Sequence, residues 1–294
     1  MSERSTTADW LTWALSPSAS AIVITFLVAI LSPIALHLYL YRSRARSSAS
    51  TFLLLGSSGA GKTTLATLLQ GGQPSKTHTS QEPQTIECYL PGTIEALSQG
   101  YRSQNDPTVK AERKFAVIDT PGHGKLRHHA IASLEGPESK ELRGIIFVVD
   151  SAAISSPTGL TETATYLHDL LLLLQKRRAD AKSSKGPVSL PILIAANKLD
   201  LFTALPAQLV RKYLEDEITN VRTTRAKGLL DSGVGMDDQG EEREWLGEGG
   251  DGPFKFGHMA ESDIDINVVG GNVVGEKGQA GEVNEWWAWI ADNM

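Results

Sequence analysis

The stretch GSSGAGKT, residues 56–63, decides the fold class of this 294-residue chain. It matches the pattern G-x-x-x-x-G-K-[ST] in full and directly follows the apolar run TFLLL, residues 51–55. In this pattern a glycine-rich turn joins a buried strand to a helix, and successive backbone N–H groups of the turn point at phosphate oxygens. We therefore predict a strand, a phosphate-binding turn and a helix over residues 63–70, with nucleotide phosphates bound at the start of that helix.

Individual residues of the turn have distinct predicted roles. Lys62 is expected to reach the β- and γ-phosphates, and the Thr63 hydroxyl to ligate Mg²⁺, which prefers oxygen ligands. The glycines allow the backbone to curl closely around the phosphate oxygens. The complete predicted phosphate-binding set is Gly56, Ser57, Ser58, Gly59, Ala60, Gly61, Lys62, Thr63 and Thr64.

A second motif, DTPGH at residues 119–123, follows an apolar run that ends at residue 118. An acid at the carboxyl end of a strand can hold Mg²⁺, usually through water, so Asp119 is predicted to be a metal residue. Gly122 offers a backbone N–H with no side chain in the way, which could sense a γ-phosphate. His123 has two open roles: it orients the water that attacks the nucleotide, or it packs and contacts a partner in a protein that turns over slowly.

A third motif, NKLD at residues 197–200, follows the apolar run 190–196. The Asp200 carboxylate can accept hydrogen bonds from N1–H and the 2-amino group of guanine, a donor pair that adenine lacks. Asn197 can bond to the base and tie loops together, and the Lys198 stem can lie flat on the ring. The three motifs occur in order, each after an apolar run, and together they predict GTP and Mg²⁺ as ligands.

Apolar runs typical of strands alternate with helical stretches along the rest of the chain. Strands are predicted at 51–55, 85–90, 114–118, 144–149, 190–196 and 263–269, and helices at 63–70, 161–176, 206–221 and 282–292. This order implies an α/β domain with a mostly parallel sheet and helices on both faces. The last helix carries Trp286, Trp287 and Trp289, which we expect to pack on the sheet.

The N-terminal part of the chain has a different character. Residues 19–41 contain no Asp, Glu, Lys or Arg, and as a helix they would span about 34 Å, enough to cross a bilayer core. We predict one transmembrane helix there, with a tail at 1–18 and a basic juxtamembrane linker at 42–50. The three arginines of the linker place the domain 51–294 in the cytosol by the positive-inside rule. A cleaved signal peptide is disfavoured because the tail lacks a positive excess and the apolar core is long.

Composition excludes some classes of function. The formal net charge of −6 argues against a generally basic nucleic-acid binder. A single cysteine, Cys88, excludes an intrachain disulfide. Residues 231–252 are acidic and glycine-rich with few apolar side chains. We expect this insertion to be solvated and partly disordered, with a role in binding a basic partner as the alternative.

The three motifs make the chain resemble the Ras-like small GTPases over about residues 51–294. Within that group it is most similar to the family of signal recognition particle receptor beta subunits, especially the fungal members. The similarity rests on the apolar anchor just before the phosphate loop and on His123, where many Ras-like proteins have Gln. The stretch THTSQEP at 77–83 is similar to switch I of fungal members, and FKF at 254–256 is also typical of the family.

The resemblance implies a Ras-like P-loop GTPase fold and a single-pass protein of the endoplasmic reticulum membrane. Its tail would be lumenal and its GTPase domain cytosolic. In that family the beta subunit holds the receptor's alpha subunit at the membrane for co-translational targeting, and the alpha subunit's N-terminal domain binds the GTP-loaded form. Hydrolysis would be slow or stimulated by a partner, with the translocon and the ribosome as further candidate partners.

The resemblance also implies roles for residues outside the motifs. Thr79 would be the switch I threonine that closes on Mg²⁺ and the γ-phosphate, with Thr77 and Thr85 as nearby alternatives. The last base-binding loop, usually Ser-Ala-Lys, falls at Val269-Gly270-Gly271-Asn272 in this chain, with Gly270 and Gly271 as its binding residues. Their backbone N–H groups are expected to contact the guanine O6.

Two other classes of function stay open from the sequence. An Arf- or Sar-like traffic GTPase would use an amphipathic or lipidated N-terminus, and residues 19–41 are too uniformly apolar for that. An ATPase or nucleotide kinase could use the same phosphate loop, but NKLD argues against it. Competition with ATP and nucleotide-dependent capture of an alpha subunit would separate the three.

Overall fold

The computed structural model describes residues 25–34, 37, 50–91, 113–136, 142–181, 189–231, 246, 252–275 and 278–294. The chain divides into two compact units, Met1–Ser48 and Ala49–Met294. In the first unit residues 25–34 form a helix. No helix among the described residues is both long and apolar enough to cross a bilayer. Most of the predicted anchor 19–41 and its two flanks lie outside the described residues, so these boundaries stay predictions.

The second unit is built on a six-stranded sheet with the strand order β2-β3-β1-β4-β5-β6. The strands are β1 (Ser50–Gly56), β2 (Gln84–Tyr89), β3 (Lys114–Asp119), β4 (Leu142–Asp150), β5 (Leu190–Asn197) and β6 (Ile264–Gly270). All neighbours run parallel except β2 and β3, which form an antiparallel pair in which Gln84 lies opposite Asp119. The predicted mostly parallel sheet is confirmed, with each predicted strand found within a few residues of its place.

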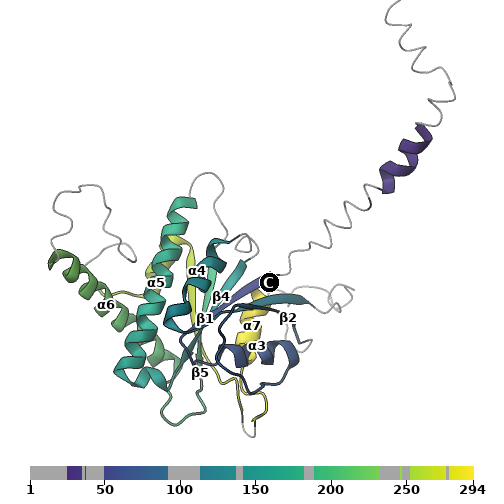
Figure 1. The fold of residues 1–294 in the computed structure, drawn as a ribbon. Helices are drawn as coiled ribbons and strands as arrows, with labels where there is room; N and C mark the ends of the chain where they lie inside the picture. Colours follow the sequence, from purple (N-terminus) through teal and green to yellow (C-terminus); the bar gives the residue numbers. More distant parts are fainter. Residues whose placement is uncertain are drawn as a thin grey trace, which may run out of the picture. The chain divides into compact units, whose positions relative to one another are not determined.

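Helices cover both faces of the sheet (Figure 1). They are α3 (Lys62–Gly71), α4 (His128–Glu135), α5 (Pro157–Ala181), α6 (Ala207–Asp231) and α7 (Asn284–Asp292), with short 3₁₀ helices η3 (Gly124–Leu126), η5 (Ala153–Ser155) and η6 (Phe256–Ser262). Helices α5 and α6 extend well beyond the predicted ranges 161–176 and 206–221. Helix ends are the feature that a sequence pattern locates least well.

Two apolar cores form because alternate residues of each strand point to opposite faces. Leu53 and Leu55 of β1 belong to the core shared with α4, α5 and α6. Phe52 and Leu54 belong to the core shared with α3 and α7. All three tryptophans of α7 are buried in this second core, as predicted: Trp286, Trp287 and Trp289. The indole of Trp286 also donates a hydrogen bond to the Val269 carbonyl at 3.2 Å, which fixes α7 beside the end of β6.

The segment before β6 is held to α6 by a buried carboxylate. Glu215 is 5% exposed, and its Oε1 accepts the Phe256 N–H at 3.1 Å while its Oε2 accepts from Lys255 Nζ at 3.0 Å. Upstream, Leu246 is 1% exposed and belongs to the core shared with α5 and α6. Leu246 therefore anchors the acidic insertion 231–252 in the core. Most of its other residues lie outside the described ones, so their predicted disorder stays a prediction.

Candidate nucleotide-binding site

The phosphate loop lies between β1 and α3, at the carboxyl edge of the sheet (Figure 1). Gly61 precedes the first residue of α3 and has φ +99°, a backbone angle that L side chains rarely adopt. A Cβ there would also lie 2.4 Å from Nδ2 of Asn197. Glycine at this position therefore lets the phosphate loop approach the NKLD motif closely.

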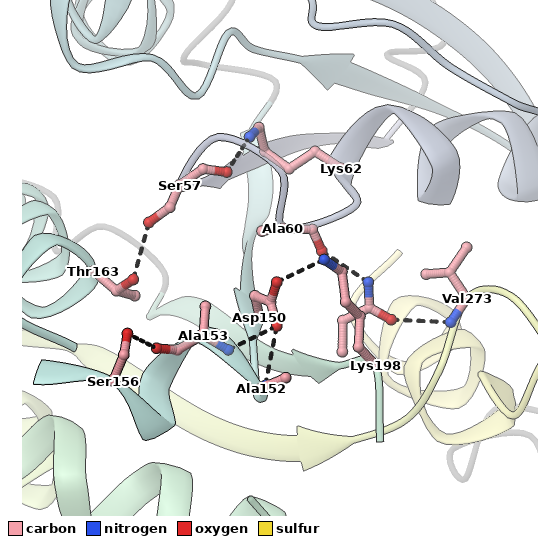
Figure 2. Close-up of polar contacts among 11 residues, drawn as sticks. Ser57, Ala60, Lys62, Asp150, Ala152, Ala153, Ser156, Thr163, Lys198 and Val273 are labelled. Atoms are coloured by element: carbon pink, nitrogen blue, oxygen red, sulfur yellow. Dashed lines mark hydrogen bonds and ion pairs between the residues drawn. The ribbon is translucent and has the colours of Figure 1, made fainter. Parts of the chain in front are cut away.

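Lys62 curls back over the loop that precedes it. Its Nζ donates to the carbonyl oxygens of Gly56 and Ser57, both at 2.9 Å (Figure 2 draws the second bond). Burial lowers the pKa of Lys62 to about 8, with Asp119 opposing this shift and the Arg127 charge adding to it. A cation that loses hydration on burial gains from an anionic ligand, so the electrostatics of this position suit a phosphate.

Thr63 and Asp119, the two motif residues predicted to bind Mg²⁺, contact each other. The Thr63 hydroxyl donates to Asp119 Oδ2 at 2.8 Å, and the other carboxylate oxygen, Oδ1, is buried without a hydrogen-bond partner among the described residues. Burial raises the pKa of Asp119, although the Thr63 hydrogen bond and the Lys62 charge oppose the shift. An unsatisfied buried oxygen costs free energy unless a ligand uses it. The residues present therefore fit a Mg²⁺ ion, which binds oxygen ligands.

The three threonines named for switch I take different positions. The Thr77 hydroxyl lies 3.1 Å from that of Thr64, and Thr85 lies within β2, opposite Ile118. Thr79 is exposed and lines a cavity of about 420 Å³ together with His123. Thr79 thus lies with His123 of the DTPGH motif at an open cavity, and no hydrogen bond among the described residues joins it to Thr63 or Asp119.

Gly122 and His123 follow β3 beside the phosphate loop. A Cβ at Gly122 would lie 2.3 Å from Lys62 Nζ and 2.8 Å from the Gly56 carbonyl oxygen, so only glycine fits this close approach. His123 Nδ1 accepts a hydrogen bond from the Lys125 backbone N–H at 3.3 Å. Because a backbone N–H can only donate, a neutral His123 carries its proton on Nε2. In this arrangement Nε2 can donate to a water or phosphate oxygen, but it cannot take a proton from water.

The NKLD motif is joined to the phosphate loop by Asn197. Its Nδ2 donates to the Ala60 carbonyl at 2.8 Å, and its Oδ1 accepts the Val273 N–H at 3.0 Å; Figure 2 labels these two partners. Asn197 is 2% exposed, whereas Asp200 is exposed at the end of the motif. The side chain of Asn197 thus ties loops together as predicted, and Asp200 is accessible to a base.

The glycines proposed for the last base-binding loop have another role in this arrangement. The Gly271 N–H donates to the Ala196 carbonyl at 2.9 Å, which extends the pairing of β5 and β6. A Cβ at Gly270 would lie 2.6 Å from Leu199 Cδ1, and one at Gly271 would lie 2.6 Å from the Glu282 carbonyl oxygen. Both glycines therefore permit close packing behind the NKLD motif, and the N–H of Gly271 is not available to a guanine O6.

Two further residues of the site were not predicted. Asp150, the last residue of β4, contacts Lys198 with 2.6 Å between Oδ2 and Nζ. Thr163 of α5 lies with its hydroxyl 3.0 Å from that of Ser57 (Figure 2). Asp150 had the same signal as Asp119, since it follows an apolar run directly. Thr163 had no signal, because nothing in a helical stretch shows that it reaches a loop far away in the sequence.

Comparison with known proteins agrees with this geometry. The family model described as signal recognition particle receptor beta subunit matches residues 47–263. The beta subunit of Saccharomyces cerevisiae is 28% identical over 246 residues, covering 83% of this chain and 84% of the relative, and that of Homo sapiens is 31% identical, covering 74% and 68%.

Solved structures give the same result. The SRb-GTP/SRX complex of the signal recognition particle receptor from Chaetomium thermophilum matches with a TM-score of 0.64 and 35% identity, covering 83% of this chain and 100% of that chain. The SRb-GDP-Mg structure from the same organism has a TM-score of 0.58 and 37% identity, covering 84% and 99%. The family model, the relatives and the solved structures all indicate the same family. The chain belongs to the family of signal recognition particle receptor beta subunits.

Proposed function

We propose that this chain binds GTP and Mg²⁺ and, in the GTP-bound state, holds the receptor's alpha subunit at the endoplasmic reticulum membrane. The observation that carries the proposal is the Asn197 side chain, which bonds to Ala60 of the phosphate loop and to Val273. One buried side chain thus connects the loop that fits phosphates with the motif that fits guanine. A relative 35% identical to this chain has been solved as an SRb-GTP complex with SRX.

The residues of the site have separate tasks in this proposal. Lys62 exchanges its two carbonyl partners for phosphate oxygens, and Asp200 accepts the hydrogen bonds of guanine. Thr63 and Asp119 hold Mg²⁺, which when bound neutralises part of the phosphate charge. Gly122 donates its N–H to a γ-phosphate, so that the segments 75–85 and 120–135 become ordered into a docking surface only in the GTP state.

His123 acts on water as a donor in this proposal. Its Nε2 carries the proton when Nδ1 accepts from Lys125, so it can orient a water or stabilise a phosphate oxygen but not serve as a base. Removal of a proton from the attacking water then needs another group or a changed ring orientation. This arrangement supports slow hydrolysis, or hydrolysis stimulated by a partner.

The membrane anchor belongs to the same proposal. Residues 19–41 form the spanning helix, 1–18 the lumenal tail and 42–50 the basic linker, which leaves the GTPase domain in the cytosol. Protease treatment of sealed microsomes should digest the domain and spare a tagged tail. Protection of the GTPase domain would contradict this topology.

Capture of the alpha subunit's N-terminal domain tests the function directly. The full chain, reconstituted in lipid nanodiscs, is loaded with a non-hydrolysable GTP analogue, with GDP or with no nucleotide, each with Mg²⁺. Capture is expected only with the GTP analogue, and excess ATP should not compete for loading. Equal capture in the three states would overturn GTP gating, and loading blocked by ATP would overturn guanine selectivity.

A further inference from the structure

Lys198 is held in place both at its backbone and at its ammonium group. Its backbone has φ +66°, in the left-handed region that a lysine adopts only where its surroundings impose it. The following N–H, of Leu199, donates to the Gly271 carbonyl at 3.3 Å. At the far end, Nζ lies 2.6 Å from Asp150 Oδ2. The methylene stem of Lys198 is therefore held between two anchored ends.

Asp150 is itself held in one orientation. Its Oδ1 accepts the backbone N–H groups of Ala152 and Ala153, both at 3.0 Å, at the start of η5 (Figure 2). Two donors on one oxygen leave the other oxygen directed at Lys198. The Asp150 side chain is 20% exposed and that of Lys198 is 33% exposed, so the pair is partly shielded from water. Such a pair loses less to solvent screening than one on the open surface.

We propose that Asp150 is a positioning residue for the base: it holds the Lys198 ammonium so that the Lys198 stem forms a fixed wall for the purine ring. The inference rests on the proposed binding of a guanine nucleotide at this site. An exposed lysine stem must give up much rotamer freedom to lie against a ring. In this chain the ion pair restricts the stem before the nucleotide arrives, which reduces the entropy lost on binding.

Asp150 also supports the local structure of η5, and the test has to separate this effect from the positioning of Lys198. The carboxylate also stabilises η5, and η5 leads through Ser156 into α5: the Ser156 hydroxyl donates to the Ala153 carbonyl at 2.7 Å and accepts the Gly159 N–H at 3.2 Å. Asp150→Asn keeps a carbonyl oxygen for the two N–H groups but loses the negative charge that faces Lys198. Ser156→Ala loosens the same junction and leaves the pair of Asp150 and Lys198 intact, so it serves as the matched control.

Dissociation of a fluorescent GDP from the full chain in detergent, with Mg²⁺, measures the effect. Asp150→Asn should release it about 10-fold faster, and Ser156→Ala should stay within about 2-fold of the wild type. Lys198→Met, which keeps an unbranched stem without the ammonium, should show the same acceleration as Asp150→Asn. Asp150→Asn added to Lys198→Met should have no further effect, because the two residues act through one contact.

The ratio of GDP to IDP affinity gives an independent readout. Inosine lacks the 2-amino group that Asp200 would accept, but its ring has the same faces, so Asp150→Asn should weaken both nucleotides by the same factor. The role of Asp150 would be overturned if Asp150→Asn released GDP at the wild-type rate. It would also be overturned if the double variant released GDP faster than Lys198→Met alone. Either result would leave the proposed function standing. Absence of GDP binding by the wild type would instead overturn the proposed function.

Discussion

The hydroxyl groups of Ser57 and Thr163 lie 3.0 Å apart and join the phosphate loop to helix α5 across 106 residues of sequence. Thr163 is 5% exposed, so its hydroxyl is shielded from water. On the opposite side of the loop, Asn197 bonds to the Ala60 carbonyl. The phosphate loop is therefore braced from two sides by side chains that come from other parts of the fold, which keeps its curvature in place.

Thr163→Val should weaken nucleotide binding although Thr163 is not expected to touch the nucleotide. Valine keeps the shape of threonine but leaves the Ser57 hydroxyl without its partner. A hydrogen bond of this kind contributes about 1 kcal/mol, so the Kd for GDP should rise about 5-fold. Isothermal titration calorimetry measures it, with Thr165→Val on the same helix as the control. Equal Kd values for the two variants would show that the bond to Ser57 does not support the loop.

Removal of the Lys62 charge should stabilise the nucleotide-free protein at neutral pH. The pKa of Lys62 is lowered to about 8 by burial, so between about pH 8 and 10.5 the unfolded chain binds more protons than the folded one at this residue. The contribution of Lys62 to the unfolding free energy therefore rises with pH across that window. In urea denaturation the advantage of Lys62→Met over the wild type should shrink from pH 8 to pH 10.5. A constant difference would contradict the lowered pKa.

Asp119→Asn should remove the response to Mg²⁺. In the wild type, chelation of Mg²⁺ should speed GDP release about 10-fold, since the ion holds phosphate oxygens. In Asp119→Asn the chelator should add little, while Asp265→Asn, an exposed acid on β6, should behave as the wild type. Burial raises the pKa of Asp119, so Mg²⁺ affinity should begin to fall at a higher pH than for an ordinary aspartate. A full chelator response in Asp119→Asn would exclude this residue from the metal site.

Asp200→Asn should change the preferred base from guanine to xanthine. The carboxylate accepts from N1–H and the 2-amino group, and xanthine presents a 2-oxo group that can accept from the asparagine amide instead. Loss of these hydrogen bonds should lower the preference for guanine over other bases about 100-fold or more. Competition between GDP and XDP for the fluorescent nucleotide measures the ratio. An unchanged preference would mean that Asp200 does not read the base.

Glu215→Gln should destabilise the fold without affecting nucleotide affinity. Burial alone would raise the pKa of Glu215, but the Phe256 N–H, Lys255 and Arg211 outweigh it and lower the pKa. The stabilisation is thus present at neutral pH and is lost as the pH falls through the folded-state pKa, below the ordinary range of glutamate. Urea denaturation should show a loss of about 1–2 kcal/mol at pH 7 that narrows in acid. Glu261→Gln, at an exposed site, should show neither effect.

Local patterns explain what could be predicted from this sequence. The phosphate loop, DTPGH and NKLD each follow an apolar run, and in a parallel sheet the carboxyl ends of such runs meet at one edge. Asp150 could have been found by the same argument, because it directly follows the run 144–149. Thr163 could not, since its contact with Ser57 depends on how α5 packs.

Other features depended on pairing and packing that no local pattern reveals. The N–H of Gly271 was expected to face guanine, but the ladder between β5 and β6 extends one residue further and uses it. Leu246 lies in an acidic, glycine-rich stretch with few apolar residues, and composition gives no sign that this leucine enters the core. In both cases the outcome was decided by a neighbour distant in sequence.

The pairing of Gln84 with Asp119 in the antiparallel strands β2 and β3 has a mechanical consequence. The segment 75–85 enters the sheet at this rung, and the segment that begins at residue 120 leaves it there. Both segments are thus attached to the sheet at one pair of residues, and Asp119 of that pair accepts the Thr63 hydroxyl hydrogen bond. If Thr63 and Asp119 hold Mg²⁺ as proposed, the ion binds where both segments join the sheet, although the two segments are far apart along the chain.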